Sequence, residues 1–542
     1  MKTKKNKVVI VGAGMAGLTA GAYLCKENYD VLLLDRSNRT GGLVNTFERD
    51  GFSFDTGPRA FVNSGMVKPI LRDLGIDWET MDNKISIAIE DQMFRVDSMD
   101  SMNDYKRMLI NLYPEDTEDI ESIMESIYKL SGYTKILYAY DNPYFMDYMS
   151  DKKFVFQKLI PWTFKLLYAL RKFNQFNMPM EEFLEHQTDN HAIRDILTQF
   201  FFKETPTYFA LGYFHVWLDY FYPKGGTGRL PNLLHEKILA GGGKFKLNTQ
   251  IEEVIPSEST VIDSDGNHYE YDHLIWAADL KTLYKELNQV GLDNNTTKKI
   301  NVQAQTVSSS KPAESSFIMF VAVDRPPSYF QEKGGGHAFY TQSKQGLGDT
   351  NRGAKASLLE NFDNKSKNEI LAWLDDFCNL NTYEVSIPAL RDSTLAPEGK
   401  TGIMISCLFD YEIIEKINIA GWADEFKEAF EDRIVKLFSQ SFYPNFDKDI
   451  LLKFSTTPLT INKMVGSSGG SIVGWSFETK SPVFNELKDM PKSAQTPIPN
   501  IYQAGQWAYA PAGVPIAMLT GWHATQEIIK QSKKNRRKTL DK

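Results

Sequence analysis

Short apolar runs, separated by glycine-rich turns and helical stretches, form the pattern of the N-terminal part of the chain. Residues 7–11 are Lys-Val-Val-Ile-Val, and this uninterrupted run predicts a strand buried on both faces. A glycine-rich turn, a helical stretch over 18–26 and a second apolar run over 31–34 follow. The order of strand, helix and strand predicts a parallel β–α–β unit and therefore an α/β fold.

Further apolar runs and helical stretches of the same kind lie hundreds of residues after the first unit. Because they resemble the parts of one doubly wound sheet, we expect a Rossmann-type domain assembled from discontinuous segments. The predicted elements are helices over 232–240 and 513–526 and strands over 244–247, 250–255, 273–279 and 500–505.

The turn after the first strand carries the pattern Gly-x-Gly-x-x-Gly, and an acid ends the second strand. Gly12 permits the tight turn, Gly14 lets a pyrophosphate approach backbone N–H groups, and Gly17 lets the helix pack close to the strand. The positive end of the helix favours a pyrophosphate. Asp35 is placed to accept ribose hydroxyl groups. This combination predicts a dinucleotide site, without distinguishing FAD from NAD.

Composition and charge narrow the class of protein. The 542 residues hold 61 Lys and Arg against 69 Asp and Glu, and this net charge of −8 gives no support to nucleic-acid binding. Cys25, Cys378 and Cys407 are too few and too widely spaced for a disulfide framework or a zinc site, which suits the reducing cytoplasm. No run of about 20 apolar residues is present. We expect no metal and no membrane-spanning helix.

Two more motifs distinguish between the dinucleotides. Residues 39–42 are Arg-Thr-Gly-Gly, and residues 51–59 end in Asp-Thr-Gly-Pro-Arg. With these motifs the sequence resembles the flavoprotein superfamily of amine oxidases, protoporphyrinogen oxidase and phytoene desaturases. The resemblance implies FAD, wrapped beyond its ribose by the Arg-x-Gly-Gly stretch and approached at its isoalloxazine by the Gly-Pro turn. The chain departs from the superfamily at Asp35, where Glu is usual, and at Leu43, where a basic residue is common.

The end of the chain agrees with this resemblance. Such flavoproteins close the FAD site with a strand that ends near Gly505 and a helix that starts near Gly513, whose positive end would stabilise an anionic reduced flavin. The resemblance also places the backbone of Ile251 beside the adenine. The residues expected to contact FAD are Gly12, Ala13, Gly14, Met15, Ala16, Gly17, Asp35, Arg36, Arg39, Gly41, Gly42, Leu43, Gly57, Pro58, Arg59, Ile251, Ala277, Gly505, Gln506, Gly513, Val514, Pro515 and Ala517.

Other segments narrow the resemblance to the phytoene desaturase branch, which includes carotenoid isomerases and retinol saturases. These segments are residues 222–226, 315–320, 456–460 and 469–475. The resemblance implies a discontinuous FAD-binding domain and an α+β substrate domain. The expected limits are 1–89, 216–289 and 491–530 for the FAD-binding domain, 90–215 and 290–490 for the substrate domain, and 531–542 for a basic tail.

Residues 151–180 combine basic and aromatic side chains with almost no acid. Six Lys or Arg residues stand against the single Asp151. The predicted helix over 159–170 is about 18 Å long, too short to cross a hydrocarbon core of about 30 Å. A helix of this composition can lie in a membrane interface, although a solvated face packed on the core is the alternative. The basic tail would add attraction to anionic lipid or would simply fray.

Two residues are candidates for a direct part in catalysis. Arg59 follows the Gly-Pro turn and would bind a substrate carboxylate or stabilise charge on the flavin; the alternative is a structural ion pair. His337 precedes an apolar strand and would shuttle a proton; the alternative is a hydrogen-bonded structural histidine.

The resemblance implies an FAD-dependent oxidoreductase that desaturates, saturates or isomerises carbon–carbon bonds of a long apolar polyene or isoprenoid, such as a carotenoid. In such a desaturase a hydride equivalent passes from an allylic carbon to the flavin. Two alternatives stay open: a protoporphyrinogen-oxidase-like or amine-oxidase-like flavoenzyme, and a non-catalytic protein that binds prenyl lipids. The expected partners are the apolar substrate and a membrane surface, and the sequence does not name the electron acceptor.

Overall fold

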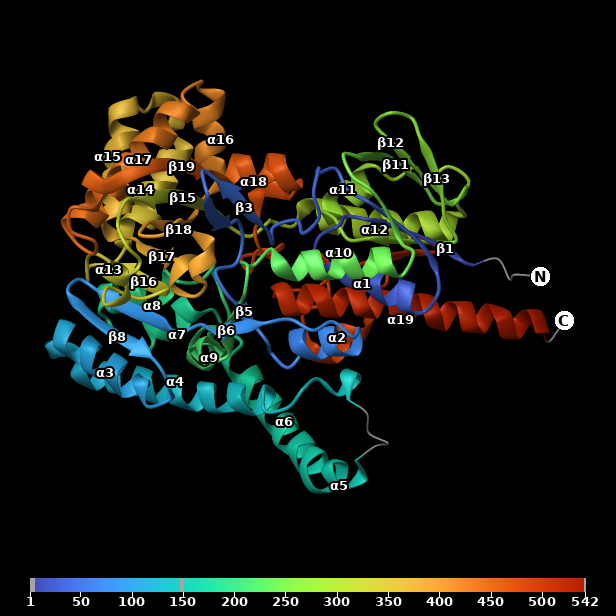
Figure 1. Cartoon of the computed structure of the whole chain (residues 1–542), viewed down its shortest axis with the longest axis horizontal. Helices are drawn as coiled ribbons and strands as arrows, with labels where there is room; N and C mark the ends of the chain where they lie inside the picture. Colours follow the sequence, from blue (N-terminus) through green and yellow to red (C-terminus); the bar gives the residue numbers. More distant parts are fainter. Residues whose placement is uncertain (1–4, 147–150, 541–542) are drawn as a thin grey trace.

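Two large β-sheets organise the chain in the computed structural model, which describes residues 5–146 and 151–540 (Figure 1). The first is a five-stranded parallel sheet with a β–α–β unit at its centre. In order, its strands are β10 (Lys244–Lys246), β2 (Asp30–Leu34), β1 (Lys7–Val11), β14 (His273–Trp276) and β20 (Ile501–Gln503). The predicted α/β fold with a Rossmann-type sheet is confirmed.

Helices and a small sheet cover both faces of this parallel sheet, which is why β1 is apolar throughout. Val8 and Ile10 pack on one face, and Val9 and Val11 pack on the other. The helices on the first face are α1 (Met15–Lys26), α10 (Arg229–Ala240) and α19 (Val514–Leu540), and those on the second are α11 (Leu280–Lys285) and α12 (Asn294–Ser309).

The C-terminal helix is longer than the sequence pattern indicated. The predicted helix over 513–526 begins at Val514 but continues to Leu540, so the predicted basic tail is helical to that point. No glycine or proline follows Gly521 to stop the helix. Residues 541–542, the last of the predicted tail, lie outside the described residues.

The second large sheet has seven strands. Its first five strands pair antiparallel, and β16 pairs parallel with β7. In order, the strands are β19 (Ile450–Thr456), β15 (Ser315–Val323), β18 (Thr401–Phe409), β17 (Thr382–Ser386), β16 (His337–Thr341), β7 (Ile85–Ile89) and β8 (Gln92–Val96). Although β7 lies in the segment 1–89 assigned to the FAD-binding domain, it belongs to this sheet; the division into domains stays a prediction.

Alternation along the strands gives the second sheet two different faces. Val385 and Ile405 point into a core under helices such as α17 (Ala423–Gln440). Glu384 and Ser406, one position along, point to the opposite face and line a cavity. The other helices around this sheet are α13 (Ser328–Gln331), α14 (Gly353–Glu360), α15 (Lys367–Leu380), α16 (Tyr411–Ile419) and α18 (Pro458–Val465).

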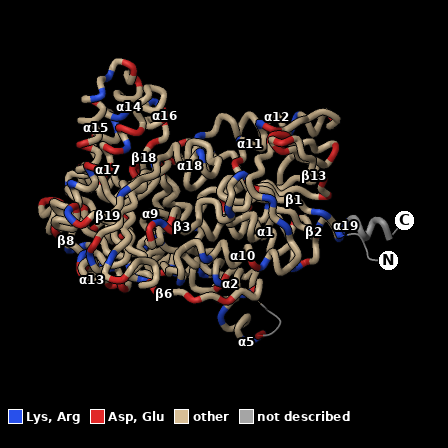
Figure 2. The backbone as a smooth tube through the Cα atoms, turned by 45° about the horizontal axis from the view of Figure 1, so that its top comes forward, with Lys and Arg blue, Asp and Glu red and all other residues tan. Residues whose placement is uncertain are grey.

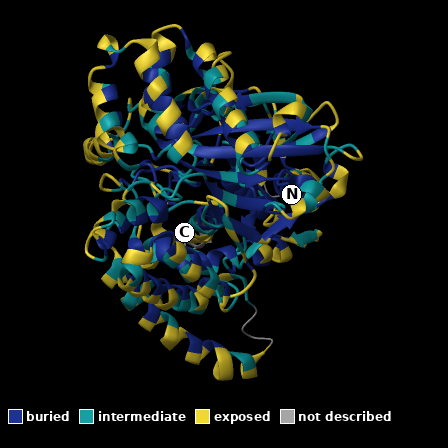
Figure 3. Cartoon of the chain, turned by 90° about the vertical axis from the view of Figure 1, so that its left-hand side faces the viewer, coloured by how far each residue is buried: buried dark blue, intermediate teal, exposed yellow. Residues whose placement is uncertain are grey.

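A helical layer lies beneath both sheets and ends in a projecting arm at the bottom of Figures 1 and 3. The arm is α5 (Lys152–Phe154), a π-helical turn (Val155–Leu159) and α6 (Ile160–Phe173), and it is largely exposed. None of the described helices is long and apolar enough to cross a membrane. The layer also contains α2 (Val67–Asp73), α3 (Ser101–Leu112), α4 (Thr117–Leu137), α7 (Met180–Glu185), α8 (His191–Thr198) and α9 (Thr207–Trp217).

Smaller sheets connect these layers. They are β3 (Thr46–Arg49) with β4 (Phe52–Asp55), then β5 (Phe61–Val62) with β9 (Tyr220–Pro223) and β6 (Thr80–Asp82), and finally β11 (Ile251–Ile255) with β12 (Thr260–Asp263) and β13 (His268–Glu270).

Candidate functional site

The glycine-rich turn after β1 opens onto a cavity of about 1810 Å³. Gly12 has a φ of +103°, and a Cβ there would lie 2.6 Å from the carbonyl oxygen of Ala277. A Cβ at Gly17 would lie 1.9 Å from the carbonyl oxygen of Gly12, so α1 can pack this close only with glycine. A Cβ at Gly14 would meet nothing within 4 Å, because this glycine borders the cavity.

The start of α1 and the end of β2 form one wall of the cavity. Gly14, Met15 and Ala16 line it, and no side-chain hydrogen bond caps the helix there; such a helix N-terminus attracts an anion. The backbone N–H groups of Ala13 and Ser37 donate to the Asp35 carboxylate at 2.6 and 2.7 Å. Burial raises the pKa of Asp35, although both N–H donors act in the opposite direction. Asp35 keeps further lone pairs for hydroxyl groups in the cavity.

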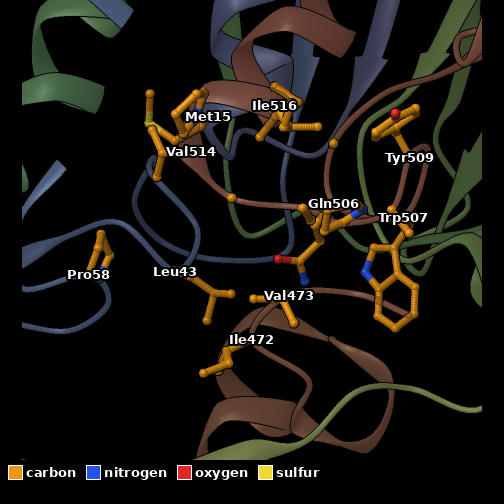
Figure 4. A pocket seen from close by; sticks show the side chains of 18 of the residues that line it. Met15, Leu43, Pro58, Ile472, Val473, Gln506, Trp507, Tyr509, Val514 and Ile516 are labelled. Atoms are coloured by element: carbon orange, nitrogen blue, oxygen red, sulfur yellow. The ribbon is translucent and has the colours of Figure 1, made fainter. Parts of the chain in front are cut away.

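Two other turns and the start of α19 surround the space beside the glycine-rich turn. We call this glycine-lined part of the cavity the cradle. Gly57 packs against the turn at Leu43, because a Cβ on Gly57 would lie 2.2 Å from the Leu43 carbonyl oxygen. Figure 4 shows Met15 and Val514 on one side of the cavity and Leu43 and Val473 on the other. Apolar side chains therefore form most of the walls, with the Gln506 amide among them, while backbone groups form the glycine-rich edges.

Most of the residues expected to contact FAD line this single cavity. Four of the predicted site residues do not line it: Ala13, Gly17, Arg39 and His337. Ala13 and Gly17 are buried in the turn and the helix, where they support the cradle. The predicted residues that line it are Gly12, Gly14, Met15, Ala16, Asp35, Arg36, Gly41, Gly42, Leu43, Gly57, Pro58, Arg59, Ile251, Ala277, Gly505, Gln506, Gly513, Val514, Pro515 and Ala517.

Comparison with known families decides the identity of the scaffold. The sequence matches the family described as flavin containing amine oxidoreductase over residues 15–376. The chain belongs to this family. FAD is the cofactor that membership implies, as predicted. The individual contacts between FAD and the cradle stay a prediction.

The proteins that this chain resembles differ in what their names say they act on. A 4,4'-diapophytoene desaturase of Staphylococcus aureus is 22% identical, with 97% of this chain and 99% of the relative aligned, which confirms the resemblance to the phytoene desaturases. A solved putrescine oxidase is 14% identical with a TM-score of 0.56, covering 97% of this chain and 99% of that one. An oxidoreductase from Methanosarcina mazei is 13% identical with a TM-score of 0.58, covering 96% and 100%. These two structures show the shared fold.

The cradle fits a flavin dinucleotide. The open space beside Gly14 accepts a group that no side chain fills, and the helix start there suits a pyrophosphate. The cavity also exceeds the roughly 300–1,000 Å³ of ordinary ligand sites. It therefore has room for a second molecule beside the cofactor.

Arg59 lines the cavity and forms no ion pair among the described residues, although the charges of Glu384 and Asp55 act on it. It is only 2% exposed, and burial lowers its pKa. Its Nη1 donates to the backbone oxygen of Asp55 at 2.8 Å, and its Nε has no hydrogen-bond partner. The structural ion pair considered as the alternative role of Arg59 is not among the ion pairs of the described residues.

His337 does not reach the cavity; Glu384 reaches it instead. The Nε2–H of His337 donates to Oε1 of Glu384 at 3.0 Å, and Asn83 donates to Nδ1 at 2.9 Å. Asn83 is oriented by Arg391, whose Nη1 donates to the Asn83 side-chain oxygen at 2.6 Å. Burial lowers the pKa of His337, so its ring is neutral near pH 7. Any influence of His337 on a ligand must pass through Glu384.

Glu384 is the site residue that the sequence analysis did not identify. Burial alone would raise its pKa, but the hydrogen bond from His337 and the positive charge of Arg59 lower it overall, so the carboxylate is ionised. The side chain is 33% exposed, and that part faces the cavity. The available signal was an acid in the middle of the otherwise uncharged run Thr-Tyr-Glu-Val-Ser.

The buried Asp55, two residues before Gly57, joins β4 to β3, to β9 and to the turn at Thr227, and its removal tests that support. Its carboxylate accepts from Thr46 at 2.6 Å, from Tyr222 at 2.6 Å and from the backbone and hydroxyl of Thr227. Asp55→Ala leaves these buried donors unpaired and should lower the free energy of unfolding by about 3 kcal/mol. Denaturant titration measures the loss. Glu48→Ala, at an exposed position of β3, is the control, with a change below about 0.5 kcal/mol. An equal effect of both variants would contradict this support.

Helix α6 presents one face to the cavity and the other to the exterior. The Trp162 indole N–H donates to the backbone oxygen of Ile136 at 2.7 Å, which anchors α6 to α4. The residues of α6 that line the cavity are Trp162, Leu166, Leu170 and Phe173. The exposed apolar residues of the arm are Phe156 (67%), Ile160, Phe164 (70%), Leu167 (58%) and Tyr168 (54%).

Proposed function

We propose that the protein is an FAD-dependent oxidoreductase that acts on carbon–carbon bonds of a long, acyclic polyene or isoprenoid by desaturation, saturation or isomerisation. The observation that carries this proposal is the continuity of the cavity, which extends from the glycine-rich cradle into a chamber lined by aromatic and aliphatic side chains. The chamber residues include Leu137, Leu166, Leu170, Phe173, Phe200, Phe201, Tyr208, Phe209, Tyr213, Trp217 and Phe339.

This lining suits a long hydrocarbon, because burial of apolar surface supplies the binding free energy. FAD, when bound, supplies the redox chemistry. The chain's own residues orient the apolar substrate, exclude water and provide the polar corner around Arg59 and Glu384. The similarity to a 4,4'-diapophytoene desaturase supports a substrate of this class.

The arm provides the route for such a substrate and a surface for a membrane. Its exposed apolar residues are accompanied by Lys152, Lys153, Lys158, Lys165 and Arg171, which are also exposed. A face of this composition is attracted to anionic lipid and inserts its apolar side chains into the interface. Because the opposite face of α6 lines the cavity, a lipid-dissolved substrate would leave the bilayer next to the chamber. A cytoplasmic location stays a prediction.

Turnover assays test the substrate class. Holoprotein is incubated with anionic vesicles that carry an acyclic isoprenoid polyene, and separately with putrescine and cyclohexylamine. We expect conversion of the polyene, detected by a change in its absorption bands and by mass spectrometry, at least tenfold faster than any amine oxidation. Faster oxidation of the amines would contradict the proposal.

An amine oxidase is the second candidate. The solved structures of putrescine oxidase and cyclohexylamine oxidase share the fold, and Glu384 places a carboxylate in the cavity that would attract an ammonium group. Against this, Arg59 places a positive charge at the same corner. The cavity volume of about 1810 Å³ and the aromatic lining also suit a chain longer than these small amines.

A further inference from the structure

A single carboxylate interrupts the apolar part of the second sheet that faces the cavity. Strand pairing aligns Phe339 with Glu384, Glu384 with Ser406, and Ser406 with Ile318. All four residues line the cavity. Within this row, Glu384 is the one charged residue. An ionised carboxylate at such a position is unfavourable unless hydrogen-bond donors satisfy it.

The protein satisfies this carboxylate only in part. Oε1 of Glu384 accepts from His337 at 3.0 Å, whereas Oε2 has the Ser406 hydroxyl at 3.5 Å, the limit of a hydrogen bond. A carboxylate has about four acceptor positions. The exposed third of the side chain faces the cavity, so the unused positions are available to a molecule there.

Arg59 offers a donor at the same corner. Its Nε is enclosed by protein, but its Nη2 makes no hydrogen bond among the described residues, and the residue lines the cavity. A continuous hydrogen-bond network links Arg59 to Glu384. Arg391 donates to the Arg59 backbone oxygen at 2.7 Å and to the side chain of Asn83. Asn83 contacts His337, which in turn donates to Glu384. The charges of Arg59 and Glu384 act on each other, although no ion pair joins the two side chains.

We propose that Arg59 and Glu384 form a binding subsite for a hydroxyl group carried by the isoprenoid substrate. A hydroxyl group donates to Glu384 and accepts from Arg59 at the same time. A pure hydrocarbon leaves both charges unpaired, an ammonium group is repelled by Arg59, and a carboxylate is repelled by Glu384. The inference rests on the proposed function, since it assumes that the chamber holds an isoprenoid chain, and it adds the polar group of that chain.

A competition experiment on the holoprotein tests the subsite. Immobilised protein is equilibrated in detergent micelles with four acyclic isoprenoids of one chain length that end in a methyl, hydroxyl, primary amine or carboxylate group. The bound molecules are quantified by mass spectrometry. Comparing bound ratios between variants cancels the partition of each compound into micelles. The variants are Glu384→Gln and Glu384→Leu, and Glu270→Leu, which removes an exposed strand carboxylate on β13 outside the cavity lining, is the control.

We expect the wild type to prefer the alcohol over the other three compounds. The ratio of bound alcohol to bound hydrocarbon should fall about tenfold in Glu384→Leu, the size expected from losing a hydrogen bond to a charged group. Glu384→Gln, which keeps the shape and the contact to His337, should reduce it by a smaller factor, and Glu270→Leu should leave it unchanged. Flavin content reports whether each variant is folded.

Three results would overturn the inference. If both Glu384 variants retain flavin and their alcohol-to-hydrocarbon ratio is unchanged, Glu384 does not bind the hydroxyl group. Preference of the wild type for the amine would assign the corner to an ammonium group. Binding of all four chains with no preference would refute the subsite but leave the proposed function standing, whereas binding of none of them would refute both.

Discussion

Gly14→Val should deprive the protein of FAD while leaving its fold intact. The backbone at Gly14 has φ −76° and ψ −176°, an extended conformation that valine adopts readily. A Cβ there meets nothing within 4 Å of the protein. The valine side chain would instead occupy the space beside the N-terminus of α1 where the pyrophosphate is expected. We expect FAD to bind at least a hundredfold more weakly, measured by titration of the apoprotein.

Two other glycines serve as controls for this result. A Cβ at Gly132 in α4 also meets nothing within 4 Å, and Gly132 does not line the cavity, so Gly132→Val should retain FAD. Gly17→Ala should reduce the yield of folded protein, because its Cβ would lie 1.9 Å from a backbone oxygen. Normal FAD affinity in Gly14→Val would place the pyrophosphate elsewhere.

Binding to anionic vesicles should fall at least a hundredfold when Phe164 and Leu167 are both replaced by glutamate. These two side chains are 70% and 58% exposed on the outer face of α6. Each apolar side chain of this size contributes about 1.5–3 kcal/mol when it leaves water, and every 1.4 kcal/mol is a factor of ten. The glutamates also repel anionic lipid. Vesicle sedimentation at several lipid concentrations measures the loss.

The matched control places the same charges on another exposed part of the surface. Val290 and Ile419 are 75% and 79% exposed and lie outside the arm, so Val290→Glu with Ile419→Glu should bind vesicles as the wild type does, apart from a small loss through net charge. Figure 2 shows basic residues on the arm near α5. Equal loss in both double variants would mean that net charge, not the arm, determines binding.

The cofactor side of the protein could be predicted from the sequence because its signals are local. Gly12, Gly14 and Gly17 lie within one turn, and Asp35 follows the next strand. The conformations of these residues depend mainly on their own short segment. The sheet that unites β1, β14 and β20 follows from the same apolar runs, which predicted each strand to within two or three residues at either end.

The substrate side depends on pairings between distant segments. His337 is conspicuous in the sequence, yet the side chain that it contacts depends on the register of β16 with β17. This register places Glu384 within hydrogen-bond distance of His337. Asn83 and Arg391 enter the network from two further loops. No local pattern contains this information, so the sequence singles out the histidine but not the carboxylate that it positions.

Helix α6 was predictable only in part, unlike the cofactor side, which follows from local signals, and the substrate side, which depends on distant pairings. Composition alone predicted a basic, aromatic helix over 159–170, and the structure contains it as α6. That the opposite face, with Trp162 and Leu166, lines the cavity depends on how α6 docks on α4. The sequence therefore predicted the surface but not its connection to the site.

Anaerobic mixing of the flavin-loaded protein with substrate tests the central claim most directly. The protein is mixed, with its flavin either oxidised or chemically reduced, with an acyclic isoprenoid polyene, and the flavin and polyene absorption bands are followed together. We predict that the polyene bands change in at least one flavin state, with a matching change of flavin oxidation state for desaturation or saturation and with none for isomerisation. Polyene bands that stay constant in both states, while putrescine or cyclohexylamine bleaches the oxidised flavin, would contradict the account.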